Sequence, residues 1–156
     1  MSNKTLAIID GDLDHPAVQA LLVIHLANAR SISPACSVHA LDDTGLRIPQ
    51  ISFYSAWRDD SLVGFGALKD LGERHGEVKS MHVAAAHRGK GMAGMILNHL
   101  IEQARLKAMT RLSLETGSQD GFAPARALYA RHGFALCDPF ADYRLDPSSV
   151  FMSREI

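Results

Sequence analysis

The sequence predicts one mixed α/β (α+β) domain over residues 1–156. A length of 156 residues fits one domain with a sizeable core. Hydrophobic residues make up 47% of the chain and charged residues 21%, as in ordinary globular proteins. Strand-like runs alternate with runs of helical period, and no repeat, low-complexity tract or linker interrupts them. A single α/β domain is the simplest organisation that accounts for all three observations.

The chain begins with a strand-like run, "KTLAIID", which the turn-forming "DGDLD" ends. Asp14 then occupies the position expected of an N-cap, with Pro16 in the first turn behind it. The spacing that follows predicts an amphipathic helix over residues 15 to 30, with an apolar stripe of Val18, Leu21, Leu22 and His25 or Leu26. The next segment, "SISPACSVHALDDTGLRIP", has no clean period, so we expect a loop with a short helix.

The middle and the end of the chain continue this alternation. "QISFYSAWRDDSLVGFGALKD" predicts two strands joined as a hairpin at Asp59 and Asp60, and "HGEVKSMHVA" predicts a third strand. Residues 91 to 107 are predicted to be helical, with a stripe of Met92, Ile96, Leu100 and Ala104 widened by Ala93, Leu97 and Ile101. "RLSLET" predicts a further strand, and residues 122 to 132 a short helix that Gly133 closes at the C′ position. "FALC" and "SVFMSRE" predict two closing strands.

Charge and cysteine usage narrow the class of protein. The formal net charge is -1, which gives no general attraction to nucleic acid or to an anionic membrane, so neither partner is expected. The N-terminus lacks an apolar leader and no run reaches transmembrane length. We therefore expect a cytoplasmic protein whose Cys36 and Cys137 are reduced. The histidines and cysteines show no metal-ligand spacing, so no metal is expected.

One junction combines glycine, positive charge and a helix start: "EVKSMHVAAAHRGKGMAG", residues 77–94. Unpaired N–H groups at a helix N-terminus attract anions, and glycines let those groups approach an anion closely. The predicted phosphate cradle consists of Arg88, Gly89, Lys90, Gly91, Met92, Ala93 and Gly94. The alternative is a tight turn whose basic residues are only solvated. The motifs of P-loop and dinucleotide-binding proteins are both missing from the sequence, which disfavours those ligands.

Two motifs in order carry a resemblance to a known family. Arg88-x-x-Gly91-x-Ala93 matches the R/Q-x-x-G-x-G/A signature of the GCN5-related N-acetyltransferases (GNAT), and "APARALYARHGF" resembles that family's A-x-x-x-Y-x-x-x-GF segment. The order of the predicted elements also agrees with the family along nearly the whole chain. The resemblance implies a GNAT fold: a central, mostly antiparallel mixed sheet of six to seven strands, splayed between strands 4 and 5 and flanked by about four helices.

The resemblance also implies how acetyl-CoA binds. The backbone N–H groups of the turn, from Arg88 through Ala93, are implied to hold its pyrophosphate. The pantetheine arm is implied to pair with the fourth strand at Met81, His82 and Val83, where the Met81 N–H stabilises developing oxyanion charge. Many relatives carry an asparagine after the fifth strand that bonds the pantetheine. This chain has Ser118 and Gln119 there instead, and Ser118 is the candidate for that place.

Glu77 is the candidate general base, because it lies at the offset from Met81 where relatives carry one and because an acceptor amine must lose a proton to attack. Strand alternation predicts that Glu77, Lys79, Met81 and Val83 share one face, with His82 on the opposite face. The alternative for Glu77 and Lys79 is a surface ion pair. A cation at Lys79 otherwise hints at an acceptor that carries a carboxylate.

Tyr129 aligns with the tyrosine that in many relatives protonates the departing thiolate, since a phenol keeps its proton at neutral pH. The alternative is an apolar contact. His39 in the irregular segment, and Phe140, Tyr143 and Arg144 in the tail, are candidates for the acceptor pocket. A solvated histidine and an ordinary surface connection are the alternatives.

The predicted function is transfer of an acetyl group from acetyl-CoA to a primary amine of a small molecule or peptide. The transfer is direct, in a ternary complex, without a cysteine nucleophile. The alternative is a non-catalytic module that binds or senses acyl-CoA. The sequence does not fix the oligomeric state; a homodimer is one candidate assembly, because dimers are common in the resembled family.

Overall fold

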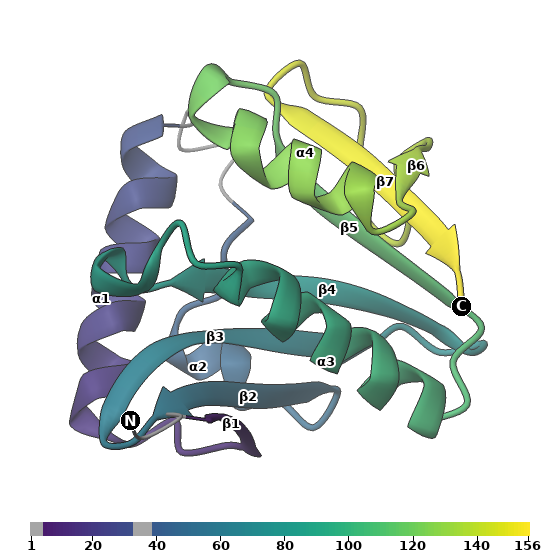
Figure 1. Cartoon of the computed structure of the whole chain (residues 1–156). Helices are drawn as coiled ribbons and strands as arrows, with labels where there is room; N and C mark the ends of the chain where they lie inside the picture. Colours follow the sequence, from purple (N-terminus) through teal and green to yellow (C-terminus); the bar gives the residue numbers. More distant parts are fainter. Residues whose placement is uncertain (1–4, 33–38) are drawn as a thin grey trace.

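A seven-stranded sheet forms the centre of the molecule in the computed structural model, which describes residues 5–32 and 39–156 (Figure 1). Its strand order is β1-β2-β3-β4-β5-β7-β6. The strands are β1 (Leu6–Asp10), β2 (Ile51–Arg58), β3 (Ser61–Asp70), β4 (His75–Val83), β5 (Arg111–Gly117), β6 (Ala135–Leu136) and β7 (Ser149–Glu155). All neighbouring strands are antiparallel except β4 and β5, which are parallel. The sheet is therefore mixed and mostly antiparallel, as the resemblance implied.

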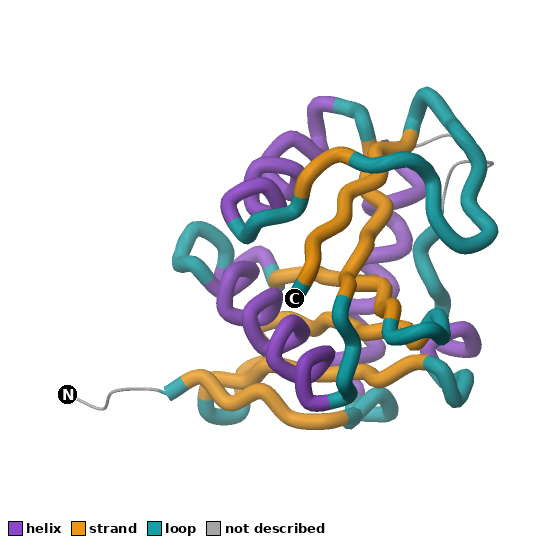
Figure 2. Tube along the Cα trace, turned by 90° about the vertical axis from the view of Figure 1, so that its right-hand side faces the viewer, coloured by secondary structure: helices purple, strands orange, loops and turns teal. Residues whose placement is uncertain are grey.

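Helices cover both faces of this sheet (Figure 2). They are α1 (Pro16–Ile32), α2 (Asp43–Leu46), α3 (Met92–Leu106) and α4 (Ala123–Arg131), with 3-10 turns at Ala85–His87 and Asp120–Phe122. Neighbouring residues of β2 separate the faces, because Phe53 packs with Val18 of α1, whereas Tyr54 packs with Leu97 of α3. Strand alternation thus gives the sheet one core under α1 and another under α3 and α4.

The predicted elements are largely confirmed, including the hairpin at Asp59 and Asp60 and the helix that Gly133 closes with a φ of 86°. The prediction of Asp14 as an N-cap is wrong. The N–H of Ala17 donates to Nδ1 of His15 (3.1 Å), and the carbonyl of His15 accepts the first helical bond, so His15 is the cap. Because α1 begins at Pro16, Asp14 lies one residue before the cap, and its carboxylate pairs with Arg47.

Two further sequence predictions concern the cysteines and the membrane. Cys36 lies outside the described residues, whereas Cys137 is exposed and carries a free thiol. Among the described residues, no helix combines the length and the apolar character needed to cross a bilayer.

Candidate active site

β4 and β5 diverge after a short stretch of pairing. Their register runs from His75 opposite Arg111 to Glu77 opposite Ser113, and no later pair joins them in the described part of the chain. Figure 1 shows β5 turning away from β4 beyond that point. The edge of β4 from Val78 onward therefore faces a gap rather than a strand. An open strand edge of this kind can pair with an extended ligand.

A β-bulge interrupts β4 beside that gap. Lys79 lies opposite Ala67 and His82 lies opposite Phe65, so Ser80 and Met81 together oppose the single residue Gly66. Ser80 adopts a φ of 56°, in the left-handed region. An extra residue shifts the alternation of side chains by one position from there on.

The bulge makes the predicted face assignment wrong beyond Lys79. Glu77 and Lys79 share the α1 side, but Met81 packs against Ile96 of α3 on the other side. His82, which was expected opposite Glu77, is on the α1 side, because its ring lies 5.0 Å from that of His25 and 6.1 Å from that of Phe65. Val83 joins Met81 on the α3 side.

The glycine turn leads from β4 into α3 as predicted. Gly89 and Gly91 have φ values of 74° and 77°, which side chains with a Cβ rarely adopt. No atom lies within 4 Å of the place where a Cβ would stand on either glycine, so open space surrounds the turn. Gly91 stands at the N-cap of α3 and offers no side chain to the first N–H groups of the helix. Backbone conformation, more than lack of room, requires glycine here.

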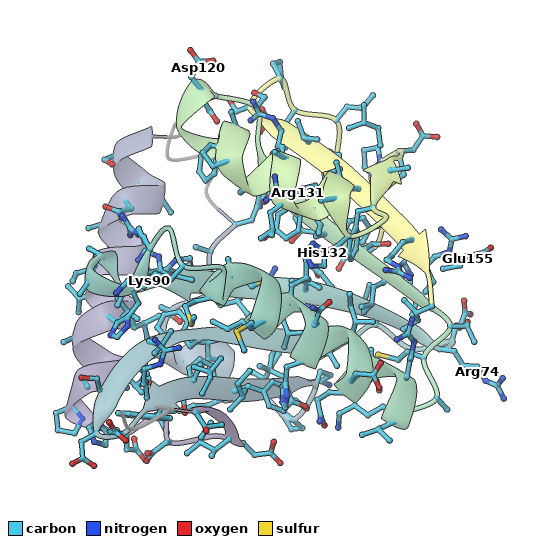
Figure 3. The ribbon with its side chains drawn as sticks, in the orientation of Figure 1. Arg74, Lys90, Asp120, Arg131, His132 and Glu155 are labelled. Atoms are coloured by element: carbon cyan, nitrogen blue, oxygen red, sulfur yellow. The ribbon has the colours of Figure 1, made fainter. Side chains whose placement is uncertain are left out.

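A cavity of about 450 Å³, here called the turn cavity, lies between this turn and α4. Figure 3 shows Lys90 on the turn and Arg131 on α4. The lining residues are Met81, His82, Val83, His87, Arg88, Gly89, Gly91, Met92, Ala93, Gly94, Pro124, Ala125, Leu128, Tyr129 and Arg131. Of the predicted cofactor residues, Lys90 and Ser118 do not line it. The Ser118 hydroxyl donates to the carbonyl of Pro147 (2.6 Å).

A smaller cavity of about 150 Å³, the inner chamber, opens between β4, β5 and α1. The lining residues are His25, Ala29, His39, Ala40, Glu77, Val78, Lys79, Ser80, Met81, Glu115, Thr116, Gly117, Phe122, Ala125, Tyr129 and Tyr143. Met81, Ala125 and Tyr129 line the turn cavity as well. Those three residues therefore form the border at which the two cavities meet.

A buried cluster of Glu77, Lys79 and Tyr143 forms one wall of the inner chamber. The Tyr143 hydroxyl donates to Oε2 of Glu77 (2.6 Å), and Nζ of Lys79 donates to the same oxygen (3.2 Å) and to the Tyr143 oxygen (2.9 Å). The side chains of Glu77 and Lys79 are only 3% and 9% exposed, so the two residues form an ion pair, but a buried one rather than the surface pair considered from the sequence. Burial and the charge of Glu77 raise the pKa of Tyr143 far above its ordinary value, which keeps the phenol a donor.

A second carboxylate, Glu115 of β5, lines the chamber opposite this cluster. The Ser149 hydroxyl donates to it (2.8 Å), and burial raises its pKa. Burial, followed by the charge of Glu115, also raises the pKa of Tyr129 to about 12. Tyr129 therefore stays protonated throughout the neutral range, as its proposed role requires.

The remaining candidates for an acceptor pocket gather around Tyr143. The ring of His39 lies 5.0 Å from that of Tyr143 and the ring of Phe140 lies 5.1 Å from it, both in edge-to-face contact. A third cavity of about 620 Å³, the outer hollow, shares His39, Glu77 and Tyr143 with the inner chamber, and Lys69 and Arg144 also line it. The ring of Phe140 also lies 6.0 Å from that of Phe151, and Phe140 lines none of these three cavities.

Sequence reasoning missed two residues of the site. His25 was placed in the apolar stripe of α1, yet its ring lines the inner chamber, and an imidazole within a stripe of Val and Leu was the available signal. Glu115 was passed over inside the strand "RLSLET", where one acidic residue among buried neighbours stands out. Within residues 5–32 and 39–156, no three His, Cys, Asp or Glu side chains gather as metal ligands would, and the absence of a metal stays a prediction.

The splayed sheet, the glycine turn at the start of α3 and the tyrosine between two cavities are the features of an acyl-CoA-dependent transferase fold. Comparison with known families makes the assignment definite. The model of the Acetyltransferase (GNAT) family matches residues 18–134, and the chain belongs to that family of acetyltransferases.

Relatives and solved structures agree with this assignment. The chain is 51% identical over 142 residues to the uncharacterized N-acetyltransferase YedL of Escherichia coli K12, covering 91% of this chain and 89% of the relative. It is 50% identical over 145 residues to the uncharacterized N-acetyltransferase YsnE of Bacillus subtilis, covering 93% and 96%. A crystal structure from Klebsiella pneumoniae, assigned to the acyl-CoA N-acyltransferases, superposes with a TM-score of 0.80 at 27% identity over 98% of this chain and 99% of that one.

Proposed function

We propose that the protein transfers an acetyl group from acetyl-CoA directly to a primary amine of a small molecule or peptide, in a ternary complex. The observation that carries this proposal is the shared border of the turn cavity and the inner chamber at Met81, Ala125 and Tyr129. A thioester that enters from the turn and an amine that enters from the α1 side would meet there. Both reactants are then in contact without a covalent enzyme intermediate.

The turn and the edge of β4 fit coenzyme A. The turn has open space at the Cβ positions of Gly89 and Gly91, and Arg88 and Arg131 line the turn cavity with positive charge for a pyrophosphate. The backbone N–H of Arg88 already donates to the carbonyl of Ala85 (3.4 Å), so the N–H groups from Gly89 to Ala93 are the candidates to bind the anion. No strand pairs with β4 on the β5 side beyond Glu77, so Met81 and the N–H of Val83 are the candidates to pair with the pantetheine amides, since the Val83 carbonyl already accepts from Nε of Arg88. A Bacillus subtilis acetyltransferase solved in complex with CoA shares this fold, with a TM-score of 0.71 at 18% identity.

Three groups of this chain would act on the reacting atoms. Glu77, directly or through water, takes a proton from the acceptor ammonium, and the free nitrogen forms a bond to the acetyl carbon. As the carbon–sulfur bond breaks, this nitrogen gives up its second proton, which reaches the departing sulfur by way of solvent, so that the products are the amide and the CoA thiol. The Met81 N–H donates to the carbonyl oxygen as negative charge develops on it. Tyr129 donates its hydroxyl proton towards the leaving sulfur. Because the pKa of this phenol is about 12, above the ordinary value of a thiol, a hydrogen bond stabilises the sulfur before any proton transfer completes.

The cavities also bound the acceptor. The inner chamber has room for an amine head, and the outer hollow beyond Tyr143 has room for the rest of the molecule. Lys79 is bonded to Glu77 and Tyr143, so an acceptor carboxylate would instead meet Lys69 or Arg144 in the outer hollow. A relative from Azospirillum brasilense, 39% identical over 79% of this chain, is named IAA acetyltransferase. One from Escherichia coli, 30% identical over 79%, is named streptothricin acetyltransferase.

The test is release of free thiol from acetyl-CoA in the presence of amino acids, peptides, polyamines and streptothricin. Turnover with any of them supports transfer, and its absence with every class of amine favours a module that only binds acyl-CoA. Tyr129→Phe should reduce kcat about 10- to 1,000-fold with little change in CoA affinity. Tyr54→Phe is the matched control, since Tyr54 is as buried but lines none of the three cavities. Equal kcat values for the two variants would remove Tyr129 from the mechanism, and a trapped acetyl-cysteine intermediate would overturn direct transfer.

A further inference from the structure

A chain of three side chains joins α1 to the glycine turn. Nδ1 of His25 lies 3.0 Å from Nδ1 of His82, on the strand that precedes the turn. The other ring nitrogen of His82, Nε2, lies 3.3 Å from a terminal nitrogen of Arg88. Nε of Arg88 also donates to the carbonyl of Val83 (3.1 Å). The guanidinium is therefore held at two points at the rim of the turn cavity.

The chemistry of these groups fixes the direction of each hydrogen bond. A guanidinium has donors and no acceptor, so Nε2 of His82 must accept. A neutral imidazole then carries its proton on Nδ1, which donates to Nδ1 of His25. His25 must in turn carry its own proton on Nε2. The contacts thus specify one tautomer for each ring.

The surroundings keep both rings neutral. Burial lowers the pKa of His25 to about 4, and burial followed by the charges of His25 and Arg88 lowers the pKa of His82 to about 4. The neighbour of His82 on β3 is the uncharged ring of Phe65. The ionisable groups that face His82 are therefore His25 from α1 and Arg88 from the turn. A protonated His82 would lose its acceptor and repel the guanidinium.

We propose that His82, supported by His25, is a positioning residue for CoA binding: it holds the Arg88 guanidinium in place so that the remaining N–H donors of that group are ready for the pyrophosphate. The inference rests on the proposed function in taking the turn cavity as the CoA site. A long, flexible arginine loses conformational freedom when it grips an anion, and fixing it beforehand removes that loss from the binding step. The bulge at Ser80 and Met81 makes this possible, because it turns His82 towards α1.

The arrangement has a consequence for the acceptor side. His25 lines the inner chamber and does not line the turn cavity, so a role confined to the acceptor would leave acetyl-CoA binding unchanged. Through His82, a change at His25 instead reaches the CoA site. His25→Phe should therefore raise the KM for acetyl-CoA as well as that for the acceptor.

The experiment is calorimetric titration of CoA into the full-length protein and its variants at pH 7.5. His82→Asn keeps a polar atom near Nδ1 but lacks the acceptor for Arg88, and it should weaken CoA binding about 2- to 10-fold. His82→Gln places an amide oxygen near Nε2 and should restore most of that affinity. In an Arg88→Ala background, His82→Asn should have no further effect. His99→Asn is the matched control, since the half-buried His99 contacts Tyr54 and lines none of the cavities.

Two results would overturn the inference. One is an equal loss of affinity for His82→Asn with and without Arg88, which would mean that His82 acts independently of the guanidinium. The other is a long-range nitrogen–proton NMR spectrum at pH 7 that shows His82 charged, or with its proton on Nε2. Failure of the CoA assignment gives a different result, because the unaltered protein would then bind no CoA, whereas failure of acetyl transfer alone appears only in the thiol-release assay and leaves the calorimetric comparison unchanged.

Discussion

The buried cluster of Glu77, Lys79 and Tyr143 makes a quantitative prediction about folding, separate from catalysis. Its two charged side chains are 3% and 9% exposed, so each neutralises the other in a site with little access to water. Glu77→Gln leaves the ammonium of Lys79 without its counter-charge, and Lys79→Met does the same to the carboxylate. Removal of one partner of a buried pair destabilises proteins by about 3–5 kcal/mol.

The expected sizes differ between the variants. At about 2–4 °C per kcal/mol for a chain of this length, either single charge removal should lower Tm by about 6–20 °C. Tyr143→Phe removes the hydrogen bond that the phenol donates to the carboxylate and the one that it accepts from Lys79, and it should reduce the free energy of unfolding by about 1.5–3 kcal/mol. The double variant Glu77→Gln/Lys79→Met removes both charges together. It should cost less than the sum of its parts, because neither Glu77 nor Lys79 is left as a buried charge without the other.

Urea denaturation of the four variants, followed by circular dichroism, measures these differences. Two results would refute the claim that Glu77 and Lys79 compensate each other's buried charge. One is an additive loss of stability in the double variant, and the other is a loss below about 1 kcal/mol for Lys79→Met. The outcome also decides how activity data are read. If Glu77→Gln is strongly destabilised, its lost turnover does not by itself identify a general base. The double variant then becomes the better test, because it removes the carboxylate while keeping the wall neutral.

Three further predictions follow from the structure. Gly64→Ala should destabilise the fold by about 1–3 kcal/mol in urea titrations, since its Cβ would stand 2.4 Å from the carbonyl oxygen of His82; unchanged stability would mean that the bulged strand yields freely. Acidification should also destabilise the fold. Histidines in the unfolded chain bind a proton near pH 6.5, whereas buried His25, with its pKa lowered to about 4, stays neutral in the folded protein, so the unfolded state binds more protons. The part that His25 contributes should begin below about pH 6.5 and reach about 3 kcal/mol near pH 4, and a His25→Phe variant should lack it, while His82, with the same lowered pKa, adds a loss of similar size. Gly133→Ala should lower the free energy of unfolding by about 1 kcal/mol, because the φ of 86° that ends α4 is unfavourable for alanine. An unchanged Tm would contradict this prediction.

The elements could be predicted from the sequence because local patterns encode them. The apolar stripe from Met92 to Ala104 and the glycines of the turn each depend on residues that are close together in the sequence. The structure places both where they were expected. The wall of the inner chamber could not be predicted in this way. Tyr143 meets Glu77 across 66 positions of sequence, and only the packing of the tail onto β4 brings them together. The predicted N-cap of α1 was wrong for a related reason, since the carboxylate of Asp14 pairs with Arg47, which is distant in the sequence.

The bulge in β4 is the feature that sequence periodicity was least able to show, and the site depends on it. Ser80 adopts a left-handed φ without the glycine or asparagine that would signal one. With regular alternation, Met81 would point to the α1 side with Glu77 and Lys79, and His82 would point away from His25. The extra residue instead sends Met81 towards α3 and His82 towards α1. Neighbouring residues can then serve different parts of the site, with Met81 at the border of the two cavities and His82 behind Arg88. A single irregularity in one strand therefore underlies both the proposed acetyl-transfer geometry and the proposed support of the CoA turn.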